Sequence, residues 1–183
     1  HEKGKKKFGI DWQRLRISHL GTSSRKRING HVDYPISFCY IKSTEGTSIR
    51  NRYFSADYLA ARAKGIPCGA YHFFSTRTPA AAQARYFIAN SKFRKGDLPP
   101  VLDIEPTCAQ IRAMGGAEAM FRNVREWINV VKRATGARPI LYISQSFVNR
   151  YLPLAPELAA GRHWLVLDAA SMDQALLADL ATA

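Results

Sequence analysis

Two acidic residues, Asp103 and Glu105, stand at the end of a short apolar run that is entered through Pro99 and Pro100. The run has the composition of a buried parallel strand, in which acids are rare. Because side chains alternate faces along a strand, both carboxyl groups share one face and Ile104 points the other way. Two carboxylates that close repel, so one of them holds its proton at higher pH than a free acid. A proton donor beside a carboxylate is the pairing used in glycoside hydrolysis, whereas the plainer alternative is two exposed acids at a strand end.

Short strand-like runs alternate with longer helix-like segments, which predicts a parallel sheet with helices packed outside it. We predict strands over residues 36–42, 67–74, 99–105, 139–143 and 164–168. We predict helices over residues 52–64, 117–134 and 145–151. A fourth helix is expected to begin after Thr78 as its N-cap, and a fifth in the last dozen residues. Asp11 is the candidate N-cap of a further helix, and residues 18–35 are expected to form a long exposed loop.

Polar side chains recur at the C-terminal ends of the predicted strands: Tyr71 with His72, then Asp103 with Glu105, then Asp168. In a closed parallel barrel these ends gather at one rim, where active sites lie. An open doubly wound sheet would also bind a ligand there, although no Gly-rich phosphate loop follows any strand. His72 fits a packed, hydrogen-bonded histidine better than a catalyst. Asp168 fits either a third site acid or a helix N-cap.

The composition is that of one soluble globular domain over residues 1–183, with 46% apolar and 22% charged residues. No apolar run approaches the roughly 18 residues of a membrane span, so membrane insertion is not expected. The chain begins at His1 without a methionine, and we expect a processed or truncated product. Trp127 lies on the apolar stripe of the predicted helix 117–134 and is expected in the core.

The formal net charge of +13 favours polyanionic partners, either nucleic acid or the anionic bacterial cell wall. The densest basic runs, residues 5–7 and 25–27, are not interleaved with aromatic residues, which counts against nucleic acid. The three cysteines, Cys39, Cys68 and Cys108, have neither CxxC nor zinc-site spacing. We therefore expect no disulfide framework and no metal site.

Several segments appear in the order of one enzyme family: Ile10-Asp11-Trp12, YIKSTEG at 40–46, GIPCGAYHFF at 65–74, QA and YF within 83–87, and LPPVLDIE at 98–105. Together they resemble the glycoside hydrolase family 25 lysozymes, the muramidases of the Chalaropsis type. The resemblance covers about residues 8–152.

The resemblance implies a modified TIM-like (β/α)5(β)3 barrel that cleaves the β-1,4 bond between N-acetylmuramic acid and N-acetylglucosamine without metal or cofactor. Glu105 matches the family's proton donor, and Asp103 matches the acid that orients the substrate's N-acetyl group. Tyr71 matches a tyrosine that lines the sugar site. Further candidates for substrate binding are Tyr142, Asp168 and Lys42, although Lys42 and Glu45 fit an ion pair bracing the rim equally well.

Two departures from the family pattern matter. The family opens with a Gly-x-Asp-x-Ser strand whose aspartate belongs to the site. Because residues 1–4 resemble the turn after that strand, we expect the strand to be absent, with Gly9-Ile10-Asp11 as an alternative match. The final Trp-Gln-Tyr strand is not matched, and residues 164–168 match the preceding motif only loosely.

Three functions follow from these patterns. The first is a monomeric, secreted or cell-envelope muramidase that acts on bacterial peptidoglycan. The second is a catalytically weak wall-binding module that lacks the first-strand aspartate. A nucleic-acid binder is the third and is disfavoured, because no stacking platform or known motif is visible.

Overall fold

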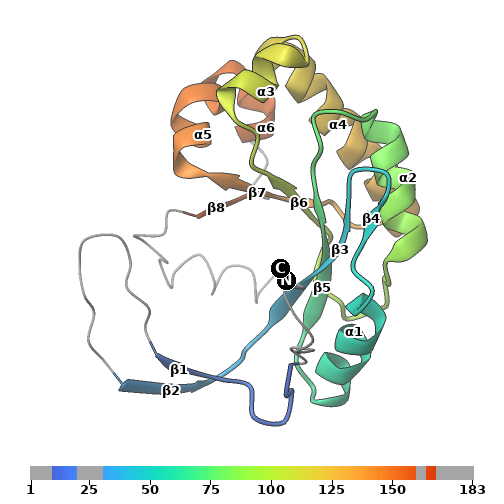
Figure 1. The fold of residues 1–183 in the computed structure, drawn as a ribbon, viewed down its shortest axis with the longest axis vertical. Helices are drawn as coiled ribbons and strands as arrows, with labels where there is room; N and C mark the ends of the chain where they lie inside the picture. The colour runs from blue at the N-terminus through green and yellow to red at the C-terminus, as the bar shows by residue number, and fades with distance from the viewer. Residues whose placement is uncertain (1–9, 20–30, 160–163, 168–183) are drawn as a thin grey trace, which may run out of the picture.

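The computed structural model describes residues 10–19, 31–159 and 164–167. Its main sheet has six strands in the order β4-β3-β5-β6-β7-β8. The parallel strands are β3 (Cys39–Glu45), β5 (Cys68–Phe73), β6 (Val101–Ile104), β7 (Ile140–Ser144) and β8 (Trp164–Leu167). The edge strand β4 (Ile49–Arg50) is antiparallel to β3. A separate antiparallel hairpin joins β1 (Arg16–His19) to β2 (His31–Pro35) and extends away to the lower left of Figure 1.

The helices are α1 (Phe54–Ala63), α2 (Ala80–Asn90), α3 (Cys108–Ala113), α4 (Gly116–Thr135), α5 (Gln145–Tyr151), η1 (Leu152–Leu154) and α6 (Pro156–Ala159). In Figure 1, α1, α2 and α4 lie to the right of β3 and β5, and α3, α5 and α6 lie above β6 and β7. Gly136 takes the left-handed conformation that ends α4, with its N–H donating to the Lys132 carbonyl. The five strands predicted from the sequence, and the helices predicted over 52–64, 117–134 and 145–151, are confirmed with ends that differ by at most three residues.

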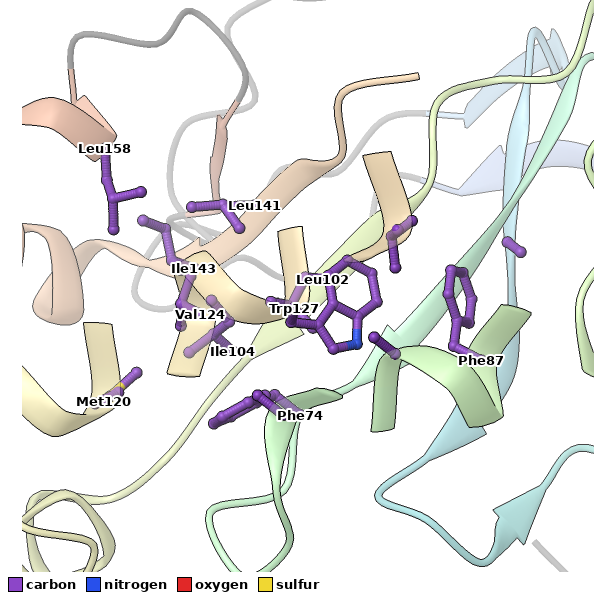
Figure 2. Close-up of a cluster of buried hydrophobic side chains, with 14 of the residues drawn as sticks. Phe74, Phe87, Leu102, Ile104, Met120, Val124, Trp127, Leu141, Ile143 and Leu158 are labelled. Carbon is purple, nitrogen blue, oxygen red and sulfur yellow. The ribbon is translucent and has the colours of Figure 1, made fainter. Parts of the chain in front are cut away.

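The core fills the space between the sheet and α2 and α4 (Figure 2). Trp127 of α4 is fully buried, as predicted, and its ring lies 5.3 Å from Phe87 of α2. Leu102 and Ile104 of β6 point into the same cluster. Because residues alternate along a strand, Asp103 between them must point to the opposite face. The apolar packing of β6 therefore decides where its acid points.

The prediction of an α/β fold with a parallel sheet is confirmed, and the closed barrel is not. The described strands form an open sheet with β4 and β8 at its edges. The barrel with missing first and last strands therefore stays a prediction. Within the described ranges, no helix combines the length and apolarity needed to cross a lipid bilayer.

Three local predictions are wrong. The chain makes only a turn after Asp11, whose carboxylate accepts from the Gln13 N–H at 3.0 Å, because the backbone becomes extended at β1. Parts of the expected loop 18–35 belong to β1 and β2, whose strands pair with each other. Thr78 does not cap α2, because Pro79 occupies the N-cap position and no side chain there accepts from the helix; the Thr78 carbonyl accepts from the Gln83 side chain at 2.7 Å. The helix expected in the last dozen residues lies outside the described residues.

Candidate active site

The register of three neighbouring strands sets the centre of the site. Asp103 of β6 is paired with Phe73 of β5 on one side and with Tyr142 of β7 on the other. Tyr71 lies two residues before Phe73 and shares its face. Glu105 follows β6 directly and is exposed at the C-terminal edge of the sheet. The structure therefore brings together both predicted acids and both predicted tyrosines.

Asp103 is the most electrostatically perturbed acid of this group. Burial, and then the charge of Glu105, raises the pKa of Asp103 to about 7, while Lys42 acts in the opposite direction. The Oδ1 atom of Asp103 is buried and has no hydrogen-bond partner among the described residues. A buried carboxyl oxygen without a hydrogen-bond partner costs folding free energy. Such oxygens are found at functional sites, where a bound ligand supplies the missing partner.

The two tyrosines remain protonated at neutral pH. Burial raises the pKa of Tyr71, and the charges of Asp103, Glu105 and Glu45 raise it further. Burial also raises the pKa of Tyr142, again with added effects of Asp103 and Glu105. Each ring therefore presents an apolar surface and a hydroxyl donor beside the acids, which suits the binding of a polar ring-shaped ligand.

Lys42 and Glu45 form the ion pair that was one of the two predictions for them. The Lys42 Nζ atom lies 2.7 Å from Glu45 Oε2, and both side chains are about one third exposed. The same ammonium lies 4.9 Å from the centre of the Phe73 ring. The role of Lys42 in substrate binding stays a prediction.

His72 lies on the opposite face of β5, toward the helices, and is a packed histidine as predicted. Its Nδ1 lies 2.7 Å from the Thr44 hydroxyl and its Nε2 lies 3.0 Å from Gln83 Oε1. Because that amide oxygen accepts, Nε2 carries the proton and Nδ1 accepts from Thr44. Burial lowers the pKa of His72 to about 4, so the ring is neutral and stacks on Trp127 at 5.7 Å.

The remaining candidate acids are Asp168 and Asp11. Asp168 lies outside the described residues. Asp11 is exposed in the turn before β1, and its neighbour Trp12 donates to Asp57 of α1 at 3.2 Å. Among the described residues, no group of three or more His, Cys, Asp or Glu side chains could hold a metal ion.

Phe73 is the site residue that the sequence reasoning missed. It lies in register with Asp103 and beneath the ammonium of Lys42. A signal is present in the sequence, because the two-residue spacing from Tyr71 places both rings on one face. That signal is weak, since a phenylalanine in an apolar strand is most often a core residue.

An acid pair of this kind, flanked by phenols at the C-terminal edge of a parallel sheet, can be compared with known enzymes. The sequence profile of the glycosyl hydrolases family 25 matches residues 10–175. This chain belongs to that family. The matched range includes all of the main sheet and both acids.

Curated relatives agree with this assignment. The chain is 35% identical over 143 residues to the uncharacterized protein YegX of Escherichia coli K12, which covers 78% of the chain and 47% of YegX. It is 36% identical over 118 residues to the N,O-diacetylmuramidase of Chalaropsis sp., covering 60% of the chain and 56% of that enzyme. The chain thus spans about half the length of the curated relatives it matches.

Solved structures show the same fold. The bacterial lysozyme of Streptomyces coelicolor superposes with a TM-score of 0.62 at 31% identity, covering 71% of this chain and 62% of that one. The muramidase of Acremonium alcalophilum gives a TM-score of 0.60 at 29% identity, covering 70% and 64%.

Proposed function

We propose that this chain supplies the catalytic site of a peptidoglycan hydrolase, an N-acetylmuramidase that cleaves the β-1,4 bond between N-acetylmuramic acid and N-acetylglucosamine. The observation that carries the proposal is the half-buried Asp103 carboxyl, whose Oδ1 atom is buried and unpartnered among the described residues and which is followed two residues later by an exposed second acid. Membership of a family that contains muramidases supports this substrate class.

The two acids have different surroundings and are assigned different roles. Glu105 is exposed past the end of β6, where it can reach the oxygen of the leaving sugar as the general acid. Asp103 is held deeper on the same face, where it orients the substrate's N-acetyl group. Tyr71 and Tyr142, on the strands at either side, line the sugar site, with Lys42 and Asp168 as further substrate contacts.

The partner follows from the same chemistry. Bacterial peptidoglycan is the proposed polymer, and the net charge of +13 favours approach to an anionic wall. A secreted or cell-envelope location and a monomeric state are proposed with it, because an insoluble extracellular substrate demands the first and a single site on one chain needs no second copy.

The decisive experiment compares Glu105→Gln with the wild type on purified bacterial walls. The substitution conserves shape and removes only the transferable proton, so we expect turbidity loss to slow by about 10²- to 10⁴-fold. Wall binding in a pull-down should stay unchanged. Glu118→Gln is the matched control, since Glu118 is exposed on α4 and pairs with Arg122 at 3.1 Å. More than half of the activity remaining in Glu105→Gln would rule out Glu105 as the acid.

A catalytically weak wall-binding module is the second candidate. The turn at Asp11 favours it, because this alternative match for the first-strand aspartate is exposed and its neighbour Trp12 bonds to Asp57 of α1. Wall binding by the wild type without any turbidity loss would support this candidate over the hydrolase.

A further inference from the structure

The strand β3 contains a bulge that changes which of its side chains face the site. Lys42 and Glu45 are three residues apart, so a regular strand would point them to opposite faces. The register shifts instead, with Lys42 opposite Tyr71 and Glu45 opposite Phe73 on β5. One extra residue, Ser43, is accommodated between them. Lys42 and Glu45 therefore lie on the same face of the sheet as the two aromatic residues.

The bulge is held from the side of the helices. The buried Ser43 hydroxyl donates to the Asn90 carbonyl at the end of α2 at 3.2 Å and accepts from the Ser91 hydroxyl at 2.8 Å. Asn51 donates from its side chain to the Lys42 carbonyl and from its backbone to the Ser43 carbonyl, both at 2.8 Å. Four hydrogen bonds thus hold the backbone that presents Lys42.

The ammonium of Lys42 is held at a defined place on that face. Glu45 binds it at 2.7 Å, and the Phe73 ring lies 4.9 Å below it. Phe73 is the residue in register with Asp103 on the neighbouring strand. The positive charge is therefore held beside the position of the buried Asp103 carboxyl, with an aromatic ring excluding water beneath it.

We propose that Lys42, clamped by Glu45, is a positioning residue that acts through Asp103. Its ammonium favours the charged form of the Asp103 carboxyl against burial and the charge of Glu105, and this inference rests on the function proposed above. The charged form matters because the proposed role of Asp103, orienting the substrate's N-acetyl group, needs a carboxylate beside that group.

The groups that face Asp103 explain why a cation is needed. Glu105 of its own segment is an acid, and Tyr71 of β5 and Tyr142 of β7 are neutral phenols. Burial and the Glu105 charge both favour the protonated form of Asp103, and Lys42 is the cation that opposes them. Glu45 faces the same surface, and its charge is taken up by Lys42.

The test measures the pH dependence of kcat/KM on a soluble peptidoglycan fragment. In Lys42→Met we expect the midpoint on the acid side of the kcat/KM profile to move up by roughly 0.5–1 pH unit. The shift is small for the loss of a nearby opposite charge because Lys42 is one third exposed. Lys42→Arg should keep the wild-type midpoint. Lys132→Met, which removes an exposed cation on α4, is the matched control. A Lys42→Met enzyme with raised KM and an unmoved midpoint would show that Lys42 contacts the substrate without acting on Asp103, and would overturn the proposal.

Glu45→Gln tests the clamp separately. Releasing Lys42 should move the midpoint upward as well, because Glu105 and Lys42 are the charges that shift Asp103 directly. The same substitution in the Lys42→Met background should have no further effect. A midpoint shift of equal size in both backgrounds would mean that Glu45 acts without Lys42, and the proposal would fail.

A readout without turnover separates this inference from the proposed function. Carbon-13 NMR of aspartate-labelled protein, with the Asp103 signal assigned through Asp103→Asn, follows the carboxyl directly. An inactive chain in which Lys42→Met still moves the Asp103 titration upward would reject the hydrolase while confirming that Lys42 acts on Asp103. An active chain in which neither Lys42→Met nor Glu45→Gln changes the titration midpoint of Asp103 would reject this inference and leave the proposed hydrolase standing.

Discussion

Asp103 of β6 and Tyr142 of β7 are in register, so a carboxyl and a phenol stand side by side on one face of the sheet. The Asp103 charge raises the pKa of Tyr142, after the larger effect of burial. Yet Asp103 Oδ1 has no hydrogen-bond partner among the described residues. The packing of β6 thus leaves the Oδ1 atom of this carboxyl available to a ligand.

The placement of both acids on one strand predicts the stereochemistry. Two residues apart on an extended chain, Asp103 and Glu105 have Cα atoms about 6.5–7 Å apart and project toward the same side of the sugar. A nucleophile and an acid normally flank the scissile bond, so Asp103 is badly placed to attack and well placed to hold the N-acetyl group. We expect a β product without a covalent adduct, and a rate loss of about 10²- to 10³-fold in Asp103→Asn.

Proton NMR of the first-formed anomer and mass spectrometry of the enzyme during turnover test this route. An α product, or an adduct on Asp103, would contradict the substrate-assisted mechanism.

The buried Asp103 carboxyl should cost stability at neutral pH. Its pKa is raised from 3.8 to about 7, so between these values the folded chain holds a proton that the unfolded chain has lost. The cost therefore grows as pH rises through this window and is constant above it. We expect Asp103→Asn to raise the Tm by about 2–6 °C near pH 8, after allowing for solvent access to the carboxyl, and to leave it unchanged near pH 3.5.

Thermal melts of both proteins across this pH range give the measurement. His72, whose pKa is lowered to about 4, makes stability fall as pH drops from 6.5 toward 4, but it does so equally in both proteins. The difference between the two Tm curves therefore isolates Asp103. A difference that does not depend on pH would refute the raised pKa.

Asp97 ties the segment before β6 to α1. Its side chain is 6% exposed, pairs with Arg62, accepts from the Tyr58 hydroxyl at 2.6 Å, and accepts from the Arg94 N–H at 2.7 Å. Asp97→Asn leaves Arg62 without its anion, and we expect a loss of about 2–4 kcal/mol in the free energy of unfolding. Tyr58→Phe should cost about 1 kcal/mol.

Urea denaturation measures both changes, with Asp33→Asn as the control. Asp33 pairs with Arg16 on the exposed hairpin, where an ion pair contributes about 0–1 kcal/mol. Equal losses in Asp97→Asn and Asp33→Asn would mean that burial of the Asp97 network is irrelevant to stability.

Gly69 of β5 allows Tyr40 of β3 to pack across the sheet. A Cβ atom at Gly69 would lie 2.5 Å from Tyr40 Cε1 and 3.0 Å from Leu98 Cβ. We expect Gly69→Ala to destabilise the fold by about 1–3 kcal/mol through this overlap. Tyr40→Leu combined with Gly69→Ala should recover part of the loss, and the absence of any recovery in denaturation curves would locate the strain elsewhere.

The sequence by itself determined which strand carries Asp103 and which residues are the candidates for the centre of the site. The apolar run around Asp103 and Glu105 predicted a buried strand, and the alternation of side chains along a strand places both acids on one face whatever the neighbouring strands are. Periodicity likewise placed Trp127 in the core. These predictions succeed because they depend on contacts within one element, whose geometry is the same in every fold.

Only the tertiary structure decided the surroundings of those residues. The burial of Asp103 comes from the strands at either side, and the shared face of Lys42 and Glu45 comes from a bulge that depends on the end of α2. The sequence pattern predicts a loop where β1 pairs with β2, because the partner strands lie apart along the chain. Register, burial and bulges are set by neighbours that are distant in sequence, and local patterns do not encode them.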